Sequence, residues 1–296
     1  MEGYLGIILA GTLAGTVSRA LLLRIDYRQY PGYPHGMVAH LSLGIIASAI
    51  GAVVIPALLK PDFAAVTFLA LAAQQFREIR GMERITLENL DQNELVQRGN
   101  DYIEGIARTF EARNFLAMGT AVLTGAAYHL GKAPAAVIIA VLAILFCRSF
   151  MSGETIGDIC RAEPARLYFE NTILKVDEIG IMAVGLEEMR KKILQDGLAV
   201  KITPLNANAR ATIHDLGQRM AIAHTAAVIL GVKKDVDTPE LTPLARKNID
   251  TGEVGLYIVP MEKDMDALLL AVKRTPVLES ARSKPLATQA GRRAVK

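Results

Sequence analysis

The chain has 296 residues, a net charge of +3 and a mean hydropathy of +0.29. A charge this small excludes the strongly basic character that nucleic-acid-binding domains show. The two cysteines, Cys147 and Cys160, cannot form the disulfide framework of a small secreted protein. At roughly 100–200 residues per domain, this length predicts two structural units.

The long apolar runs lie almost entirely before Met151, whereas most charged residues follow it. Because about 20 mostly apolar residues are needed to cross the hydrocarbon of a lipid bilayer, residues 1–150 are expected to form an α-helical transmembrane bundle of about five helices. The predicted helices cover residues 4–23, 37–59, 63–79, 115–130 and 133–150. The third has the shortest apolar stretch, so it either spans the bilayer or lies in its interface.

Particular residues give these helices their expected details. Arg19 lies near the end of the first helix, where a long side chain can snorkel to the membrane surface. Gly131 and Lys132 separate the fourth and fifth helices and predict a tight helical hairpin. Small residues four apart, such as Gly11 and Gly15, predict close helix packing. That packing occurs within the bundle or between copies of the chain, so a homo-oligomer stays open.

The short connections predict the orientation, because Lys and Arg are enriched on the cytoplasmic side of a membrane. One set of connections carries eight positive residues, namely Arg24, Arg28, Arg77, Arg80, Arg84, Arg98, Arg108 and Arg113. The alternate connections carry only Lys60 and Lys132. The sequence therefore predicts a multi-pass protein of the cell membrane with its N-terminus outside and its C-terminal half in the cytoplasm.

Residues 80–114 form a predicted cytoplasmic loop of charged, helix-favouring sequence. Its second half contains the string Tyr102-Ile103-Glu104-Gly105-Ile106-Ala107. Apolar residues recur there at helical spacing, which predicts an amphipathic segment lying at the membrane interface. Glu104 and Arg108 are spaced to form an ion pair on that helix.

Residues 160–279 are expected to form a small cytoplasmic domain, α/β or α+β, because strand and helix patterns interleave. Strands are predicted at 166–171, 173–176, 198–203 and 255–259, and helices at 186–194, 208–232 and 264–273. Residues 280–296 contain five basic and no acidic residues, which predicts a disordered basic tail. Such a tail could also contact anionic lipid.

The string at residues 102–107 resembles the motif that names the YIEGIA family of endospore-forming bacteria. The helical N-terminal half and the trailing domain are also similar to that family. The resemblance implies a sporulation-associated protein of the cell membrane, or of the forespore or spore membrane, that works with a small soluble protein subunit. We expect partner-binding residues in and beside the string, namely Tyr102, Ile103, Glu104, Gly105, Ile106 and Arg108.

One tripeptide suggests enzymatic chemistry. Asp250-Thr251-Gly252 spells the sequence of aspartic peptidases, in which two carboxylates share a proton and activate water. One copy per chain would require a dimer. The polar residues 246–249 precede it where a hydrophobic strand is expected, so a polar turn is the competing interpretation.

No metal or cofactor is expected from the sequence. His214 and His224 lie ten residues apart on one predicted helix, which does not place them well on a shared face. Metal-ligand spacings and glycine-rich phosphate loops are absent.

These features favour a non-enzymatic membrane scaffold or regulatory component that docks a soluble partner through its cytoplasmic loop and domain. The alternative is a membrane-tethered aspartic-type peptidase that acts as a dimer through Asp250. A transport component is a third hypothesis. Because charges inside a membrane mark ion pathways, it would require Gln74, Gln75 or Arg19 to line a polar cavity.

Overall fold

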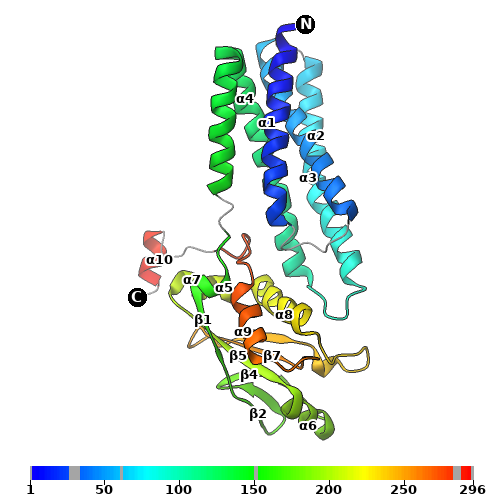
Figure 1. Cartoon of the computed structure of the whole chain (residues 1–296), viewed down its shortest axis with the longest axis vertical. Coiled ribbons are helices and arrows are strands. Elements are labelled where there is room, and N and C mark those ends of the chain that lie inside the picture. The colour runs from blue at the N-terminus through cyan, green and yellow to red at the C-terminus, as the bar shows by residue number, and fades with distance from the viewer. Residues whose placement is uncertain (1, 27–33, 61–62, 150–152, 283–287, 295–296) are drawn as a thin grey trace. The chain divides into compact units, whose positions relative to one another are not determined.

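The computed structural model describes residues 2–26, 34–60, 63–149, 153–282 and 288–294. The chain divides into two compact units (Figure 1). We call Met1–Ile85 with Ile106–Gly153 the helical unit, and Thr86–Gly105 with Glu154–Lys296 the sheet unit. The division therefore differs from a simple halving near residue 150, because a stretch between two helices belongs with the C-terminal part of the chain.

Four helices build or enter the helical unit: α1 (Glu2–Asp26), α2 (Pro34–Leu59), α3 (Phe63–Asp91) and α4 (Asn100–Ser149). Glycines let them approach closely. A Cβ atom on Gly11 would lie 2.8 Å from the carbonyl oxygen of Ala121, and one on Gly15 would lie 2.6 Å from that of Ala117. The small residues of α1 therefore pack inside this unit against α4.

Three helices of the described chain are long and apolar enough to cross a membrane, at Tyr4–Leu23, Gly36–Leu59 and Asn100–Cys147. In α3 the apolar stretch Phe63–Ala72 is shorter than a full span. These helices establish three candidate spans among the described residues, and a bundle of five crossings stays a prediction.

The longest helix, α4, reverses direction part-way along its length. Gly131 and Lys132 have non-helical backbone angles, with φ of −131° and 56°. On either side of this break, Thr120 and Cys147 come together, with 3.9 Å between the hydroxyl oxygen and the sulfur. A straight helix would separate them by about 40 Å at 1.5 Å per residue, so the two arms form a hairpin at the predicted position.

The predicted loop at residues 80–114 is mostly helical. Helix α3 continues to Asp91 and α4 begins at Asn100, which leaves only residues 92–99 between them. The charged, helix-favouring composition covers the end of one helix and the start of the next. In that start Ile103 and Phe110 are fully buried, so the apolar stripe faces protein in this structure and not a membrane interface.

The sheet unit contains two antiparallel sheets. The first has the order β1–β5–β7–β6, from strands Cys160–Pro164, Leu198–Pro204, Val254–Ile258 and Leu244–Lys247. The second is the meander β2–β3–β4, from Leu167–Glu170, Ile173–Val176 and Ile179–Ala183. Because every pair is antiparallel, the domain is α+β.

Helices cover the four-stranded sheet on one face. Between residues 154 and 282 the helices of this unit are α5 (Ile156–Ile159), α6 (Glu187–Asp196), α7 (Ala207–His214), α8 (Leu216–Leu230) and α9 (Met265–Arg274), with the 3₁₀ helix η1 (Pro239–Leu241). Leu256 of β7 packs in a core with Ile222 of α8 and Leu268 of α9. The adjacent Tyr257 faces a second core beside the meander. Strand β7 is buried on both faces, which explains its continuous apolar sequence.

The predicted helix 208–232 is two helices. Asp215 ends α7 and takes extended backbone angles, and its side chain accepts a hydrogen bond from the backbone N–H of Gln218 to cap α8. In the tail, predicted to be disordered over 280–296, Gln289–Ala294 forms the short helix α10. The rest of that prediction lies partly on residues 283–287 and 295–296, outside the described chain.

Candidate functional site

Residues 92–99, the connecting segment between α3 and α4, are fixed by one carboxylate. The side chain of Asp91 accepts hydrogen bonds from the backbone N–H groups of Arg98, at 2.7 Å, and Gly99, at 3.0 Å. The Arg98 guanidinium forms an ion pair with the Glu94 carboxylate, with 2.5 Å between Nη1 and Oε1, and its Nη1 lies 3.7 Å from Oδ1 of Asp91. Both Arg98 and Asp91 are buried, so this charge cluster is shielded from solvent.

The same segment is bound to helix α8 and the residues after it. His224 hydrogen-bonds through Nδ1 to the carbonyl oxygen of Val96 at 3.1 Å, and its Nε2 lies 3.8 Å from the Glu94 carboxylate. The Lys234 ammonium donates to the carbonyl oxygen of Leu95 at 2.6 Å. These contacts join residues more than one hundred positions apart in the sequence.

Burial lowers the pKa of His224, and the nearby Arg98 charge lowers it further, while Glu94 opposes the shift. The imidazole is therefore neutral near pH 7. With Val96 as acceptor, the proton of the neutral ring sits on Nδ1. The Tyr102 ring meets the imidazole edge-on, with 6.3 Å between ring centroids.

The first part of the six-residue string is seated in the sheet unit. Gly105 lies against Ser280, because a Cβ atom there would be 2.5 Å from the Ser280 hydroxyl oxygen. Gln218, fully buried on α8, holds the chain leading to that serine. Its side-chain amide donates to the carbonyl oxygen of Pro276 and accepts from the N–H of Leu278. Glycine is thus needed at position 105 for close packing.

The six predicted partner-binding residues do not share one exposed face. Tyr102 is 4 % exposed, and Ile103 and Ile106 are fully buried. Glu104 is half-buried and Arg108 is exposed. The apolar members of the string therefore pack within the protein, whereas Glu104 and the neighbouring Arg108 present side-chain surface.

Asp250-Thr251-Gly252 lies in the turn that joins β6 to β7. The Asn248 side-chain oxygen accepts the N–H of Asp250 at 2.9 Å, and Gly252 has a positive φ of 81°. This is the polar-turn arrangement, in which asparagine caps the turn and glycine supplies the left-handed backbone. The Asp250 carboxylate is exposed to solvent at this turn.

Sequence reasoning missed a buried arginine in the helical unit. Arg19 is 0 % exposed, so the expectation that it snorkels is wrong. Its Nε donates to the side-chain oxygen of Asn114 at 3.1 Å, and its guanidinium carbon lies 5.5 Å from the centre of the Phe110 ring. Gly44 makes room for it, because a Cβ atom there would collide with the Arg19 side chain. These neighbours fill the space around the arginine.

A second buried pair contacts the same ring. The His40 ring packs against Phe110 at a tilt of 40°, with 4.6 Å between ring centroids, and its Nε2 hydrogen-bonds to the Glu83 carboxylate at 3.2 Å. Both His40 and Glu83 are buried. The helical unit therefore encloses a polar cluster from all four of its helices, which apolar periodicity alone does not reveal.

Neither metal binding nor cysteine nucleophilicity finds support among the described residues. Among them, no three His, Cys, Asp or Glu side chains gather into a metal-binding group. Cys160 is buried in the core of the sheet unit, and burial raises the pKa of its thiol to about 12. It is therefore a protonated core side chain at neutral pH and not a nucleophile.

Comparison with known proteins assigns this chain to a family. No solved structure matches the chain. A protein of Bacillus subtilis (strain 168), described as uncharacterized protein YphB, is 44 % identical over 285 residues, which cover 96 % of each chain. The family model described as YIEGIA protein matches residues 7–288, which include the string and the segments that seat it. The chain therefore belongs to the YIEGIA family.

Proposed function

We propose that this protein is a membrane-anchored scaffold or regulatory component of sporulating bacteria, which docks a soluble partner on its sheet unit. The observation that carries the proposal is the composition of that unit. Residues 86–105, which comprise the end of α3, the connecting segment and the start of α4, are built into it. A partner that binds this unit would contact a single body made from both parts of the chain.

The membrane part of the proposal rests on the helical unit. Its surface carries large apolar side chains, including Leu13 at 64 % exposure and Phe63 at 94 %. Water makes such a surface unfavourable, whereas lipid does not. We propose five crossings, with the apolar stretch of α3 and both arms of α4 included, the N-terminus outside, and the sheet unit in the cytoplasm.

The partner and the developmental setting come from the family resemblance. A protein of this family is expected in the cell, forespore or spore membrane, together with a small soluble subunit. The half-buried Glu104 and the exposed Arg108 remain proposed contacts for that subunit. A role as a dimeric aspartic peptidase finds less support, because the Asp250 turn is fully explained by its own hydrogen bonds.

Affinity purification from sporulating cells tests this function. The tagged full chain would be solubilised in detergent and captured after light cross-linking, beside an unrelated multi-pass protein with the same tag. We expect the tagged chain to capture one soluble protein in an amount close to its own, and the unrelated control protein not to capture it. If no such protein is captured, the scaffold proposal is contradicted. If a client protein is cleaved in the presence of the wild-type chain but stays intact with Asp250→Asn, the peptidase alternative is supported instead.

A further inference from the structure

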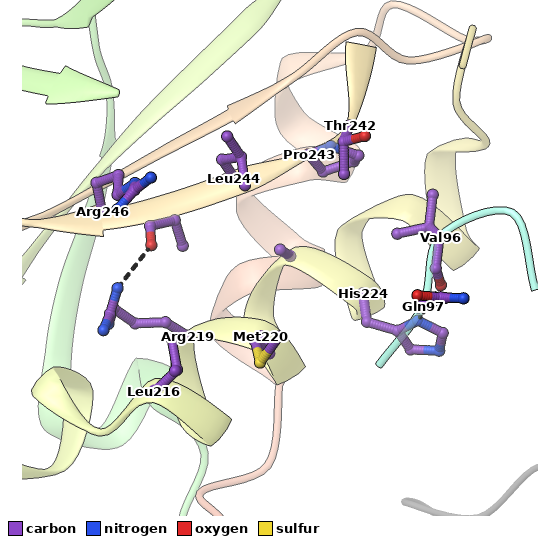
Figure 2. Close-up of a pocket in the computed structure, with 12 residues that line it drawn as sticks. Val96, Gln97, Leu216, Arg219, Met220, His224, Thr242, Pro243, Leu244 and Arg246 are labelled. Atoms are coloured by element: carbon purple, nitrogen blue, oxygen red, sulfur yellow. Dashed lines mark hydrogen bonds between the residues drawn. The ribbon is translucent and has the colours of Figure 1, made fainter. Parts of the chain in front are cut away.

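The sheet unit has a groove between helix α8 and strand β6 (Figure 2). It has a volume of about 280 Å³ and is lined by α8, by β6 with the two residues before it, and by Val96 and Gln97 of the connecting segment. Figure 2 shows Arg219 and Arg246 toward one end and His224 with Gln97 toward the other. The groove therefore lies wholly within one unit and has a charged end.

Strand β6 offers backbone groups to this groove because it is at the edge of the sheet. It pairs only with β7, in a register that sets Arg246 opposite Gly255. The neighbouring pair Asn248–Glu253 is hydrogen-bonded, so alternation along the ladder turns the backbone of Ala245 and Lys247 away from β7. An edge of this kind is where an extended peptide can add a strand.

Arginines supply the charge at the polar end. Arg219 donates through Nη1 to the outward carbonyl oxygen of Ala245 at 3.0 Å, while its buried Nε has no acceptor among the described residues. Burial lowers the pKa of Arg219, and the charge of the nearby Arg246 lowers it further. The nearby Asp215 opposes that shift, but its carboxylate already caps α8. The end of the groove thus has positive charge and a spare donor.

The middle of the groove is apolar. Met220 and Ala223 of α8 face Leu244 of β6 across it. The volume is near the lower limit of pockets that enclose a small ligand, at about 300 Å³. An aliphatic side chain fits this space, with a carboxylate two positions along the same extended peptide at the arginines.

We infer that this groove docks an extended segment of a protein partner in which an acidic and an aliphatic residue are two positions apart, because such residues lie on the same face of a strand. The segment runs along the edge of β6, its carboxylate meets Arg219 and Arg246, and its aliphatic side chain lies between Met220 and Leu244. This inference rests on the proposed docking function and names the chemistry of the partner.

The test uses the full chain in phosphatidylcholine nanodiscs and a phage library of short random peptides. The most enriched peptide is then synthesised, and its affinity is measured for wild type, Arg246→Glu and Lys191→Glu. Both arginine and lysine are exposed, so neither change is expected to unfold the protein, and both alter charge equally. Lys191 lies on α6, away from the groove, and is the matched control.

We expect enriched peptides with an acidic and an aliphatic residue two positions apart, an affinity at least about tenfold weaker for Arg246→Glu, and one within about twofold of wild type for Lys191→Glu. Selection of peptides without acids, no enrichment over empty nanodiscs, or equal losses in both variants would overturn the inference. Binding that depends on Arg246 but is seen with phosphatidylglycerol vesicles and not with peptides would also overturn it.

Capture from cells separates the two proposals. If Arg246→Glu still captures the soluble partner that wild type captures, the scaffold stands and the groove assignment is wrong. If wild type captures no partner in cells, the proposed function itself fails, whatever the peptides show.

Discussion

The two units distribute polar and apolar residues in opposite ways. In the helical unit Arg19 and Asn114 are fully buried, whereas Leu13 is mostly exposed. In the sheet unit Leu256 is fully buried, whereas the side chain of Arg161 is 70 % exposed. The contrast indicates different solvents, because a water-facing surface favours the second arrangement and lipid tolerates the first.

Each unit nevertheless buries an arginine, and the surroundings of the two arginines differ. Arg98 of the sheet unit lies against the carboxylates of Asp91 and Glu94. Arg19 of the helical unit contacts the Asn114 amide oxygen and the face of the Phe110 ring. The first arrangement neutralises a charge that holds a short segment in place. The second keeps helices together through a hydrogen bond and a cation–π contact.

The largest effect is expected at Arg98. Arg98→Leu would leave the buried carboxylate of Asp91 and the half-buried carboxylate of Glu94 without their cation, and lower the free energy of unfolding of the sheet unit by about 3–5 kcal/mol. Hydrogen exchange measured by mass spectrometry should show lost protection in residues 92–99 and in α8. Lys191→Leu breaks an exposed ion pair and should cost below about 0.5 kcal/mol. Unchanged protection in Arg98→Leu would mean that the cluster does not hold the segment.

A smaller loss is expected in the helical unit from Asn114→Leu. The change removes the acceptor of a hydrogen bond from a charged donor, which contributes about 1.5–3 kcal/mol. Thermal unfolding in detergent would measure it. Thr67→Val is the control, because its hydroxyl bonds only the carbonyl of its own helix on an exposed face. Equal melting temperatures for the two variants would show that the hydrogen bond between Arg19 and Asn114 does not stabilise the helical unit.

Glycine substitutions test how tightly the helices pack. In Gly51→Ala the new methyl group would collide with the backbone carbonyl of Met118, and overpacking costs about 1–3 kcal/mol. Gly119→Ala meets nothing within 4 Å and should stabilise its helix by about 0.5–1 kcal/mol. Melting in detergent should therefore shift in opposite directions. A shift of the same sign would show that the spacing between these helices is wrong.

Acid should weaken the sheet unit through His224. Its pKa is lowered on folding from 6.5, so the unfolded chain binds the proton more readily. Stability is then full above pH 6.5 and falls as the pH drops through that value, by at most about 1.4 kcal/mol per pH unit. The groups around the ring are Arg98, Glu94, Asp91 and Tyr102.

Unfolding of wild type, His224→Gln and His214→Gln between about pH 8 and about pH 5 would check this slope. The pKa of His214 is also lowered, mainly by its burial, so that variant measures the second contribution in the same window. We expect His224→Gln to flatten the curve more, because His224 is the more buried ring. A slope unchanged in His224→Gln would contradict the neutral imidazole.

The smallest effect is expected at Asp250. Because its carboxylate is exposed at a turn held by Asn248, Asp250→Asn should change stability by less than about 0.5 kcal/mol. Capture of the partner should also be unchanged. Loss of function in a stably folded Asp250→Asn protein would favour the peptidase over the scaffold.

The sequence predicts the elements whose pattern is self-contained. Strand β7 has a continuous apolar run, and α9 has a clear helical period and an aspartate cap. Strands β1, β4 and β6 are not predicted, and all three lie at the edge of a sheet. Edges carry polar residues, such as those of Leu244–Lys247, which hides β1 and β6, whereas β4 is a short apolar run. Asp215 also escapes, since aspartate occurs both on helix surfaces and at helix starts.

The site is less predictable than the fold, for a physical reason. The connecting segment is bound mainly through its backbone carbonyls, at Val96 and Leu95, and a backbone acceptor leaves no mark in the sequence. Likewise, periodicity does not tell which face of α1 meets α4, so Arg19 reads as a surface residue. By contrast, the string directed attention to Gly105, which the structure places in close contact with Ser280, while its role in partner binding stays a prediction.

The central claim is that residues 86–105 and the C-terminal domain form one body on the cytoplasmic side of a membrane. Single cysteines at Asn93, Lys263 and Lys132, in a chain with Cys147→Ala and Cys160→Ala, test it by labelling with an impermeant maleimide. All three positions are exposed. We predict that Asn93→Cys and Lys263→Cys react only in inverted vesicles and Lys132→Cys only in intact cells. Labelling of Asn93→Cys and Lys263→Cys from opposite faces would contradict the account.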